Sequence, residues 1–379
     1  MAGNTGSKKS AKIRVGVLYG GRSGEHDVSL CSAASVFLAL DRKKYNVTAI
    51  GIDRDGRWYV QEKPEIIPDK DFGRKLALKK KGMWLVNHFE QNNRLHIYDI
   101  KNKNKNVVVD VVFPVIHGTF CEDGTLQGLL ELAMVPYVGA DVTGSAVGMD
   151  KDIAKRLLKE AGIPVVPSVT VNKQSWKENS NAITRKAIAK LGLPLFIKPV
   201  CAGSSVGVKK VKKQESFSRA MNFAFQFDNK VLIEKAIDCR EIECAVLGNE
   251  KPDGSVLGEI IPHHEFYSYE AKYIDPNGAA LKIPAGINKS LSDKIRKIAV
   301  EGYTALGCSS MARVDFFLDK KTNKFYLNEI NTLPGFTSIS MYPKLWEASG
   351  LSYSSLLDKL IILAIDRHTK KLEIKTEGI

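Results

Sequence analysis

The sequence predicts an open α/β sheet in the first part of the chain and α+β units after it. Between residues 13 and 139, apolar runs of strand length are separated by a helix-length segment. This order is typical of a mostly parallel sheet covered by helices. After residue 162, short apolar runs follow one another closely as far as residue 262, which is typical of antiparallel strands. With 379 residues, the chain is long enough for two or three domains.

The first part is predicted to contain short strands rich in β-branched residues, at 13–19, 47–52, 107–116 and 136–139. The first strand ends in the glycine-rich turn 20–24, and Asp27 or Ser29 is expected to cap a helix over 28–40. Residues 54–106 are charged and irregular, and we expect them to form a decorated hairpin or a crossover excursion. Ligands of such a sheet bind at the carboxyl ends of its strands.

The second part begins after a predicted helix over 145–161, which Gly162 and Pro164 stop. Short strands are expected at 196–200, 206–211, 231–237, 241–247 and 256–262, with a helix near 215–225. The polar stretch 263–286 predicts a long loop that serves as a lid. A helix over 290–307, a hairpin over 311–331 and a helix over 353–366 complete the prediction.

The composition excludes several classes of protein. The chain is 44% hydrophobic and 26% charged, as in globular proteins. It has no apolar run of membrane-spanning length and no apolar signal segment at its start, so we expect no membrane partner. Six scattered cysteines without a CxxC pair favour a reducing cytoplasm. The net charge is +14, but the lysines gather in the N-terminal tail and in loops without interleaved aromatics. A solvated basic surface therefore explains them better than a nucleic-acid site.

The hairpin 311–331 predicts a metal site. Centring its turn near Thr322 places Asp315 opposite Glu329 and Arg313 opposite Asn331, at the short separation of cross-strand neighbours. Two facing carboxylates repel each other unless a cation lies between them, and with an amide oxygen they suit Mg²⁺ and phosphate. A surface charge pair is the alternative, but it would favour opposite signs.

The same hairpin also carries two apolar residues on the predicted ligand-bearing face. Phe317 and Leu327 are expected to continue its ligand-bearing face inward.

The segment 198–207 places a lysine before a loop of small residues, Gly203, Ser204 and Ser205 among them. Exposed backbone N–H groups in such a loop bind anions. It is not the Walker pattern, because the lysine precedes the glycines.

The glycine turn at 20–24 is followed by Glu25, whose charge would repel a dinucleotide phosphate and suits an ammonium group instead. Helix capping is the alternative for this residue. His117, at the end of another predicted strand, points to the same crevice. The segment 231–237, followed by Glu241, offers an adenine edge and an acid for ribose, although a plain core strand explains it equally well.

Taken together, these residues resemble the D-alanine–D-alanine ligases of the ATP-grasp superfamily. The similarity covers nearly the whole chain and rests on the blocks GGRSGEHDVSL (20–30), HGTFCEDGTLQGLLE (117–131), GSAVGMDK (144–151), IKPVCAGSSVGV (197–208), YEAKY (269–273), ARVDFF (312–317) and NEINTLPGFTSISMYPKLW (328–346). The resemblance implies a Rossmann-like N-terminal domain, called preATP-grasp, followed by a two-lobed ATP-grasp fold. The lysine-rich residues 1–12 are expected to form a disordered basic tail. The resemblance implies a substrate-binding domain at 13–150, a central lobe at 151–238 and a C-terminal lobe at 239–379 that carries the metal site and the lid.

The resemblance also implies site residues. Those for ATP are Lys151, Lys198, Ser204, Ser205, Glu234, Lys235, Ile237, Glu241, Phe266, Lys272 and Asn328. Asp315, Glu329 and Asn331 would bind two Mg²⁺ or Mn²⁺ ions, with K⁺ as a candidate activator. Those for substrate are Glu25, His117, Arg313, Gly335, Ser340 and Met341. Glu25, Ser204, Tyr273, Arg313 and Gly335 would serve catalysis.

The implied activity is ATP-dependent joining of two D-alanines through an acyl phosphate, by a cytoplasmic homodimer that serves peptidoglycan synthesis. The lid residue Tyr273 favours D-alanine over D-lactate as the second substrate, as in the ligases of the family that keep this tyrosine. The alternatives are a D-lactate or D-serine ligase, another carboxylate–amine ligase, and a nicotinamide-dependent oxidoreductase. The last of these leaves Asp315 and Glu329 unexplained.

Overall fold

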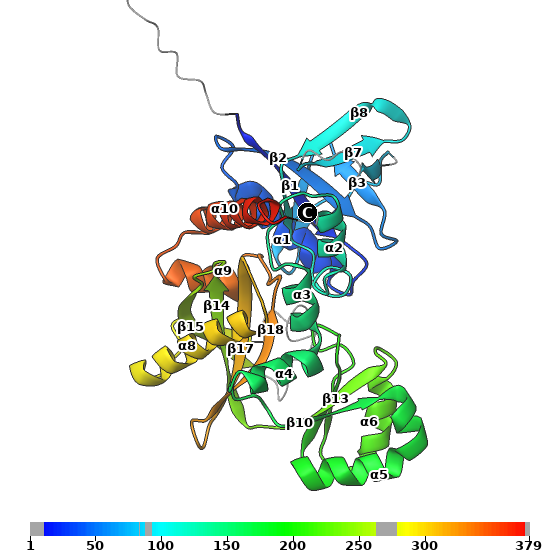
Figure 1. Cartoon of the computed structure of the whole chain (residues 1–379), viewed down its shortest axis with the longest axis vertical. Helices are drawn as coiled ribbons and strands as arrows, with labels where there is room; N and C mark the ends of the chain where they lie inside the picture. The colour runs from blue at the N-terminus through cyan, green and yellow to red at the C-terminus, as the bar shows by residue number, and fades with distance from the viewer. Residues whose placement is uncertain (1–10, 83, 88–92, 263–278, 376–379) are drawn as a thin grey trace, which may run out of the picture.

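The computed structural model of the chain describes residues 11–82, 84–87, 93–262 and 279–375. Its strands form three larger sheets and two small ones. The larger sheets follow one another along the chain, and Figure 1 shows the first at the top, the second at the lower right and the third at the lower left.

The first sheet has the strand order β3-β2-β1-β9. Its strands are β1 (Ile13–Gly20), β2 (Tyr45–Ile52), β3 (Trp58–Gln61) and β9 (Val111–Pro114). β1 pairs in parallel with both β2 and β9, whereas β3 is antiparallel to β2. Helix α1 (His26–Ala39) connects β1 to β2. The expected open α/β sheet is therefore present, and the ends of β1 and β9 lie at the same edge of it.

Local details of this part differ from the predictions. Helix α1 begins at His26 after Glu25, and no side chain caps it. Ser29 instead accepts from the backbone N–H of Gly20 and donates to the carbonyl of Val115, so it ties the helix to the sheet. Residues 136–139 form no strand, because their only ladder contact is an isolated bridge between Tyr137 and Val112. Helix α2 (Thr125–Leu132) was not predicted.

The excursion between β3 and β9 consists of two small sheets. One pairs β4 (Ile66–Asp69) with β5 (Gly73–Leu76), and the other has the order β6-β7-β8. The strands of the second are β6 (Trp84–Asn87), β7 (Leu95–Asp99) and β8 (Asn102–Val109).

The single helix predicted over 145–161 is two helices, α3 (Val142–Met149) and α4 (Lys151–Glu160). The helix is interrupted at Asp150, whose extended backbone ends α3. Its carboxylate accepts from the backbone N–H groups of Asp152 and Ile153. Because this aspartate is a good N-cap, a new helix starts directly after it. Lys151 consequently occupies the first turn of α4.

The second sheet is antiparallel and has the order β10-β13-β11-β12. Its strands are β10 (Ser168–Asn172), β11 (Leu195–Pro199), β12 (Lys209–Val211) and β13 (Lys230–Lys235). Helices α5 (Lys173–Leu191) and α6 (Phe217–Ala224) pack on it, with the short 3-10 turn η1 (Gln214–Ser216) before α6. The sequence predicted α6 but not α5.

The third sheet is also antiparallel, with the order β16-β15-β14-β17-β18. Its strands are β14 (Cys239–Leu247), β15 (Asp253–Pro262), β16 (Ala279–Lys282), β17 (Met311–Asp319) and β18 (Phe325–Asn331). Helices α8 (Lys289–Ala305) and α9 (Met341–Ala348) pack on it, and α10 (Tyr353–Leu372) follows. The stretch expected as one loop over 263–286 contains β16, and α9 was not predicted. Residues 263–278 of that loop lie outside the described residues.

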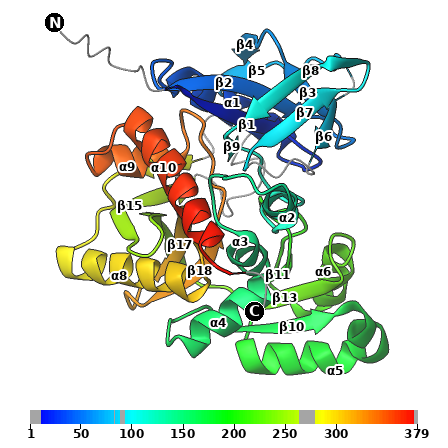
Figure 2. The same ribbon diagram turned by 45° about the horizontal axis from the view of Figure 1, so that its top comes forward.

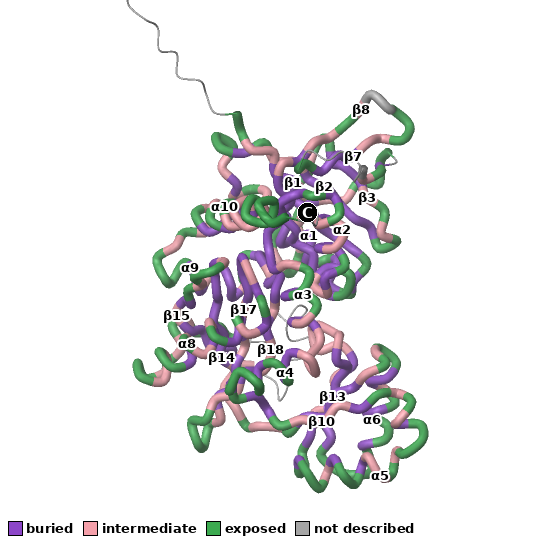
Figure 3. Tube along the Cα trace, viewed as in Figure 1, coloured by how far each residue is buried: buried purple, intermediate pink, exposed green. Residues whose placement is uncertain are grey.

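The hydrophobic cores show which units belong together. One core joins residues of the first sheet, such as Val15 and Phe113, to residues of β14, α9 and α10, such as Ala245, Tyr342 and Leu360. Figure 2 shows α10 lying between the first and third sheets. The second sheet has a separate core with α5 and α6. In Figure 3 the buried stretches run through the strands, whereas α5 and α8 present exposed outer faces.

Among the described residues, no single helix is both long and apolar enough to cross a membrane. The pair α9 and α10 meets the length and composition limits only when both are taken together, across a bend of 105°.

Candidate functional site

One large cavity, of about 880 Å³, lies where the three larger sheets meet. This volume is in the range of small-molecule sites. Of the site residues predicted from the sequence, eighteen lie in the described part of the chain and all of them line this cavity: Glu25, His117, Lys151, Lys198, Ser204, Ser205, Glu234, Lys235, Ile237, Glu241, Arg313, Asp315, Asn328, Glu329, Asn331, Gly335, Ser340 and Met341. Phe266, Lys272 and Tyr273 lie outside the described residues.

The β17–β18 hairpin has the predicted register over its functional residues. Arg313 pairs with Asn331 and Asp315 with Glu329, so the cross-strand prediction is confirmed. The prediction is confirmed for Phe317, which shares the strand face of Asp315 and lines the cavity. It is wrong for Leu327, because the register shifts directly after Asp315 and places Leu327 opposite Phe316, fully buried in the core.

Asp315 is the centre of the contacts at this hairpin. Nε and Nη2 of Arg313 donate to its two carboxylate oxygens at 2.7 and 2.6 Å, and the amide of Asn331 donates at 2.9 Å. Nε of Arg313 also lies 3.0 Å from a carboxylate oxygen of Glu243 on β14. Burial alone would lower the pKa of Arg313, but these carboxylates raise it well above its usual value, so the guanidinium is charged.

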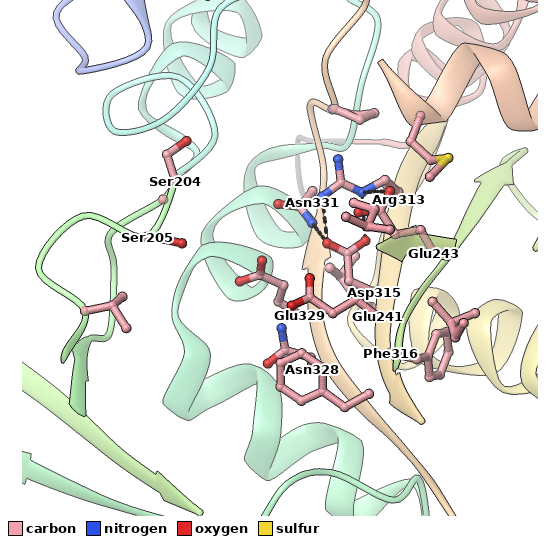
Figure 4. A pocket seen from close by; sticks show the side chains of 18 of the residues that line it. Ser204, Ser205, Glu241, Glu243, Arg313, Asp315, Phe316, Asn328, Glu329 and Asn331 are labelled. Atoms are coloured by element: carbon pink, nitrogen blue, oxygen red, sulfur yellow. Dashed lines mark hydrogen bonds and ion pairs between the residues drawn. The ribbon is translucent and has the colours of Figure 1, made fainter. Parts of the chain in front are cut away.

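The donor set at the hairpin fits a divalent cation bound together with phosphate. Figure 4 shows Glu241, Glu243, Asp315 and Glu329 on one side of the pocket, with Arg313 among them. No group of three or more His, Cys, Asp or Glu side chains in the described residues forms a complete metal cage. Mg²⁺ does not need one, since it is usually held by one or two carboxylates, water and substrate phosphates.

The opposite side of the pocket is basic. Nζ of Lys151 donates to the carbonyl of Ala202 at 2.8 Å and lies 3.8 Å from Glu329. It thereby joins the first turn of α4 to the loop that carries Ser204 and Ser205. Figure 4 shows these two serines facing the acidic cluster across the pocket. Both have positive φ, of 50° and 58°. The loop therefore has two consecutive residues in the left-handed region, which residues other than glycine rarely adopt.

Cys201 precedes this loop and has no thiolate character. Burial, followed by the charges of Asp228 and Asp150, raises the pKa of its thiol to about 12. Its backbone N–H donates to Asp228 at 2.7 Å. These properties indicate a packing role for Cys201.

Glu234 forms a buried ion-pair triad that the sequence did not reveal. Its two carboxylate oxygens lie 2.6 Å from Nζ of Lys155 and 2.6 Å from Nζ of Lys198. Glu234 and Lys155 are only 1% and 2% exposed. Burial raises the pKa of Glu234, but the two ammonium groups outweigh it and hold the pKa below its usual value. Lys198 is therefore held by a carboxylate that a second lysine shares.

The first sheet contributes Glu25 and His117. The hydroxyl of Ser204 donates to Glu25, so the loop of the second unit contacts the end of β1. His117 is hydrogen-bonded through Nδ1 to the carbonyl of Leu333 at 3.0 Å and through Nε2 to Ser32 at 3.1 Å. Burial lowers the pKa of His117, which favours a neutral ring that donates from Nδ1.

Glu122 also lines the cavity, although the sequence analysis did not single it out. It accepts from the N–H of Gly118 at 2.9 Å. Burial, followed by the charge of Glu25, raises its pKa to about 8. The signal was present in the block 117–131, where this acid lies a few residues after His117, but the proximity of Glu122 to Glu25 depends on the fold.

The loop between β18 and α9 brings Gly335 against Ser340. A Cβ on Gly335 would lie 2.7 Å from Oγ of Ser340. That hydroxyl also interacts with the N–H and hydroxyl of Thr337, at 2.9 and 2.8 Å. Met341 begins α9 and packs against Gly258, where a Cβ would meet its sulfur at 2.7 Å. Gly335, Thr337, Ser340 and Met341 all line the cavity. Asn328, in the opposite direction along β18, has a buried side-chain oxygen with no hydrogen-bond partner among the described residues.

Comparison with known proteins gives a consistent result. The family model for the D-ala D-ala ligase N-terminus matches residues 14–140, and that for the D-ala D-ala ligase C-terminus matches residues 157–362. The chain is 47% identical to D-alanine--D-alanine ligase A of Escherichia coli K12, over 96% of this chain and 99% of that protein. It is 49% identical to D-alanine--D-alanine ligase A of Bradyrhizobium diazoefficiens, over 96% and 98%.

Two solved structures are similar over nearly their whole lengths. The D-alanine-D-alanine ligase from Coxiella burnetii has a TM-score of 0.78 and 38% identity, covering 96% of both chains. The VanG D-Ala:D-Ser ligase from Enterococcus faecalis has a TM-score of 0.79 and 37% identity, covering 93% of this chain and all of that chain.

Proposed function

The chain belongs to the D-alanine–D-alanine ligase family, and from this membership we propose which of its residues carry the ATP-dependent joining of two D-alanine molecules. The observation that supports the assignment is geometric. The described residues that sequence motifs assign to the site come from distant parts of the chain, yet all of them line one cavity. A wrongly assigned set would be scattered over the surface.

The basic side of the cavity is the proposed nucleotide site. Lys151 and Lys198 bind the phosphates, and the loop with Ser204 and Ser205 covers them. Adenine lies against the second sheet, and ribose against β14. The residues assigned to adenine and ribose are Glu234, Lys235, Ile237 and Glu241. Because Glu234 is already paired with two lysines, we assign it chiefly to holding Lys198 in place. The buried oxygen of Asn328 is an acceptor for a donor group of the nucleotide.

Asp315, Glu329 and Asn331 are the proposed ligands of two Mg²⁺ or Mn²⁺ ions, which neutralise phosphate charge when bound. The excess of carboxylates in this part of the cavity supports the assignment, since Glu241, Glu243, Asp315 and Glu329 all line it beside Arg313. K⁺ remains a proposed activator.

The first reaction step takes place between the two sides of the cavity. Glu25 binds the ammonium of the first D-alanine, and neutral His117 lies beside it. The substrate carboxylate attacks the γ-phosphoryl group, the bond from that group to ADP breaks, and an acyl phosphate forms. Lys151 and Lys198 stabilise the charge on the transferring group.

In the second step the amine of the second D-alanine attacks the acyl carbon. Arg313 and the backbone N–H of Gly335 stabilise the oxyanion, phosphate leaves, and the nitrogen loses its proton as the peptide bond forms. Ser340 binds the carboxylate of the second D-alanine, and Met341 lines its subsite. An acyl phosphate hydrolyses readily, so water must be excluded. Lys272, Tyr273 and Phe266 are assigned to the lid. We further propose that the enzyme acts in the cytoplasm as a homodimer.

The test is phosphate release from ATP and Mg²⁺ with D-alanine, with D-alanine plus D-lactate, with D-alanine plus D-serine, and with L-alanine. We expect release that requires D-alanine and yields D-alanyl-D-alanine. A mixed product in preference to the dipeptide would instead favour the D-lactate or D-serine alternative. If none of these acids causes phosphate release, the proposed substrate is contradicted.

A further inference from the structure

Glu243 is a buried carboxylate in the cavity wall that none of the roles above uses. It is 4% exposed and lies in the middle of β14. A buried charge is costly unless it is paired. Its carboxylate lies 3.0 Å from Nε of Arg313, so the charge is balanced by the arginine that is proposed to bind the oxyanion.

The strand register explains this contact. Arg313 lies opposite Ala245, and Asp315 lies opposite Glu243. All four side chains share one face of the sheet. Because the alanine is small, the arginine has room to extend along the face to its diagonal neighbour. The guanidinium consequently lies between two carboxylates that face each other.

Of the two carboxylates, Asp315 has a second proposed role as a metal ligand. Asp315 gives both of its oxygens to Arg313, at 2.7 and 2.6 Å, yet it is also a proposed ligand of a divalent ion. An ion and a guanidinium compete for the same oxygen lone pairs. If Asp315 were the sole anchor, metal binding would loosen the arginine before the oxyanion forms.

We propose that Glu243 is the second anchor of Arg313, which holds the guanidinium in place when Asp315 turns to the divalent ion. Glu243 is thus a positioning residue, acting through Arg313 and without contact to the substrate. The inference rests on the proposed function, because it assumes that Asp315 is a metal ligand. It explains why an acid is placed next to a site that already has an excess of acids.

The test is Glu243→Gln, which keeps the shape of the side chain and removes its charge. Of the two ion pairs of Arg313 among the described residues, the one with Asp315 then remains, and the guanidinium competes with the ion for that carboxylate. We expect the dissociation constant of Mn²⁺ in the enzyme–ADP complex, measured from the EPR signal of free Mn²⁺, to rise about tenfold. The Mg²⁺ concentration that gives half-maximal phosphate release should rise in parallel.

A matched control is Glu259→Gln. Glu259 lies on the neighbouring strand β15 and is 7% exposed. Its carboxylate accepts from Arg240 of β14 at 2.7 Å. Among the described residues it does not contact Arg313 or Asp315. A role in packing alone predicts a similar loss of thermal stability in both variants and wild-type Mn²⁺ affinity in both. That result would overturn the inference.

A second variant, Glu243→Asp, keeps the charge and shortens the side chain by one methylene. We expect near-normal Mn²⁺ affinity but a kcat lowered about tenfold, because the guanidinium is drawn out of line. An unchanged kcat would contradict the positioning role. If the wild-type enzyme itself fails to bind Mn²⁺, the metal assignment falls and the inference with it. If the wild type binds Mn²⁺ and Glu243→Gln binds it equally well, the inference alone falls.

Discussion

Glu329 faces Asp315 across the hairpin and lies 3.8 Å from Nζ of Lys151. The side chain of Lys151 is only 11% exposed, but it keeps its hydrogen bond to the carbonyl of Ala202 when the charge of Glu329 is lost. We expect Glu329→Gln to lower kcat about a hundredfold or more through loss of a metal ligand, with an unchanged midpoint of thermal unfolding. Phosphate release and circular dichroism check the two parts. Glu301→Gln, on the exposed face of α8, is the control and should retain wild-type turnover.

The raised pKa of Glu122 predicts a pH dependence of stability. The carboxyl ionises at pH about 4.5 in the unfolded chain and at about 8 in the folded chain. Its contribution to stability is therefore fully present below pH 4.5 and is lost as the pH rises toward 8. We expect the ligand-free wild type to lose stability relative to Glu122→Gln between pH 5 and 8, measured by urea unfolding. In a Glu25→Gln background the difference should shrink, because Glu25 is the second cause of the shift. A pH-independent difference would contradict this account.

At this scale the sequence was informative where residues lie close along the chain or across a tight turn. The pairing of Asp315 with Glu329 followed from counting back from one turn, and the counting remained valid up to the register shift after Asp315. Lys155 and Glu122 were missed for the opposite reason. Lys155 contacts Glu234, and Glu122 lies within the electrostatic influence of Glu25, only because separate elements approach in three dimensions. No local sequence pattern records such an approach.

Asp150 separates α3 from α4, which the sequence analysis predicted as one helix. Its carboxylate caps α4, and its other oxygen pairs with Lys230 of β13 at 2.5 Å. We expect Asp150→Ala to lower the free energy of unfolding by about 1–2 kcal/mol, the usual cost of a lost cap. Asp150→Asn keeps a capping oxygen and should cost less than half as much. Equal losses in urea unfolding would assign the effect to the ion pair instead of the cap.

Elements with strong apolar patterns were predicted well, and those defined by context were not. Strands β1, β2, β13 and β14 lie within a few residues of their predicted bounds. The short helix α9 was missed because Pro343 and the polar residues before it conceal a buried apolar face, which packs on β14 and β15. β16 was missed because it lies at an edge of its sheet, where pairing with β15 decides its conformation.

For the whole molecule, the distribution of cores predicts how disturbances spread. Leu360 of α10 is fully buried in the core that the first and third sheets share. We expect Leu360→Ala to lower the free energy of unfolding by about 2–5 kcal/mol. Amide hydrogen exchange should become faster in both β1 and β14. Exchange in β11 and β13 should be unaffected, because the second sheet has its own core.

The matched control is Phe217→Ala, in the separate core of the second sheet. It should speed exchange in β11 and β13 and leave β1 and β14 protected. Exchange that rises everywhere in both variants would show that the three sheets unfold as one unit and would contradict the division.

The shared core also bears on how the chain is made. The first sheet is synthesised early, but α10, which covers part of it, is synthesised after both other sheets. Domains at the start of a chain generally fold first on the ribosome. Here the growing chain must carry an apolar face of its first sheet uncovered until α10 emerges, so that sheet is a natural client for a chaperone during translation.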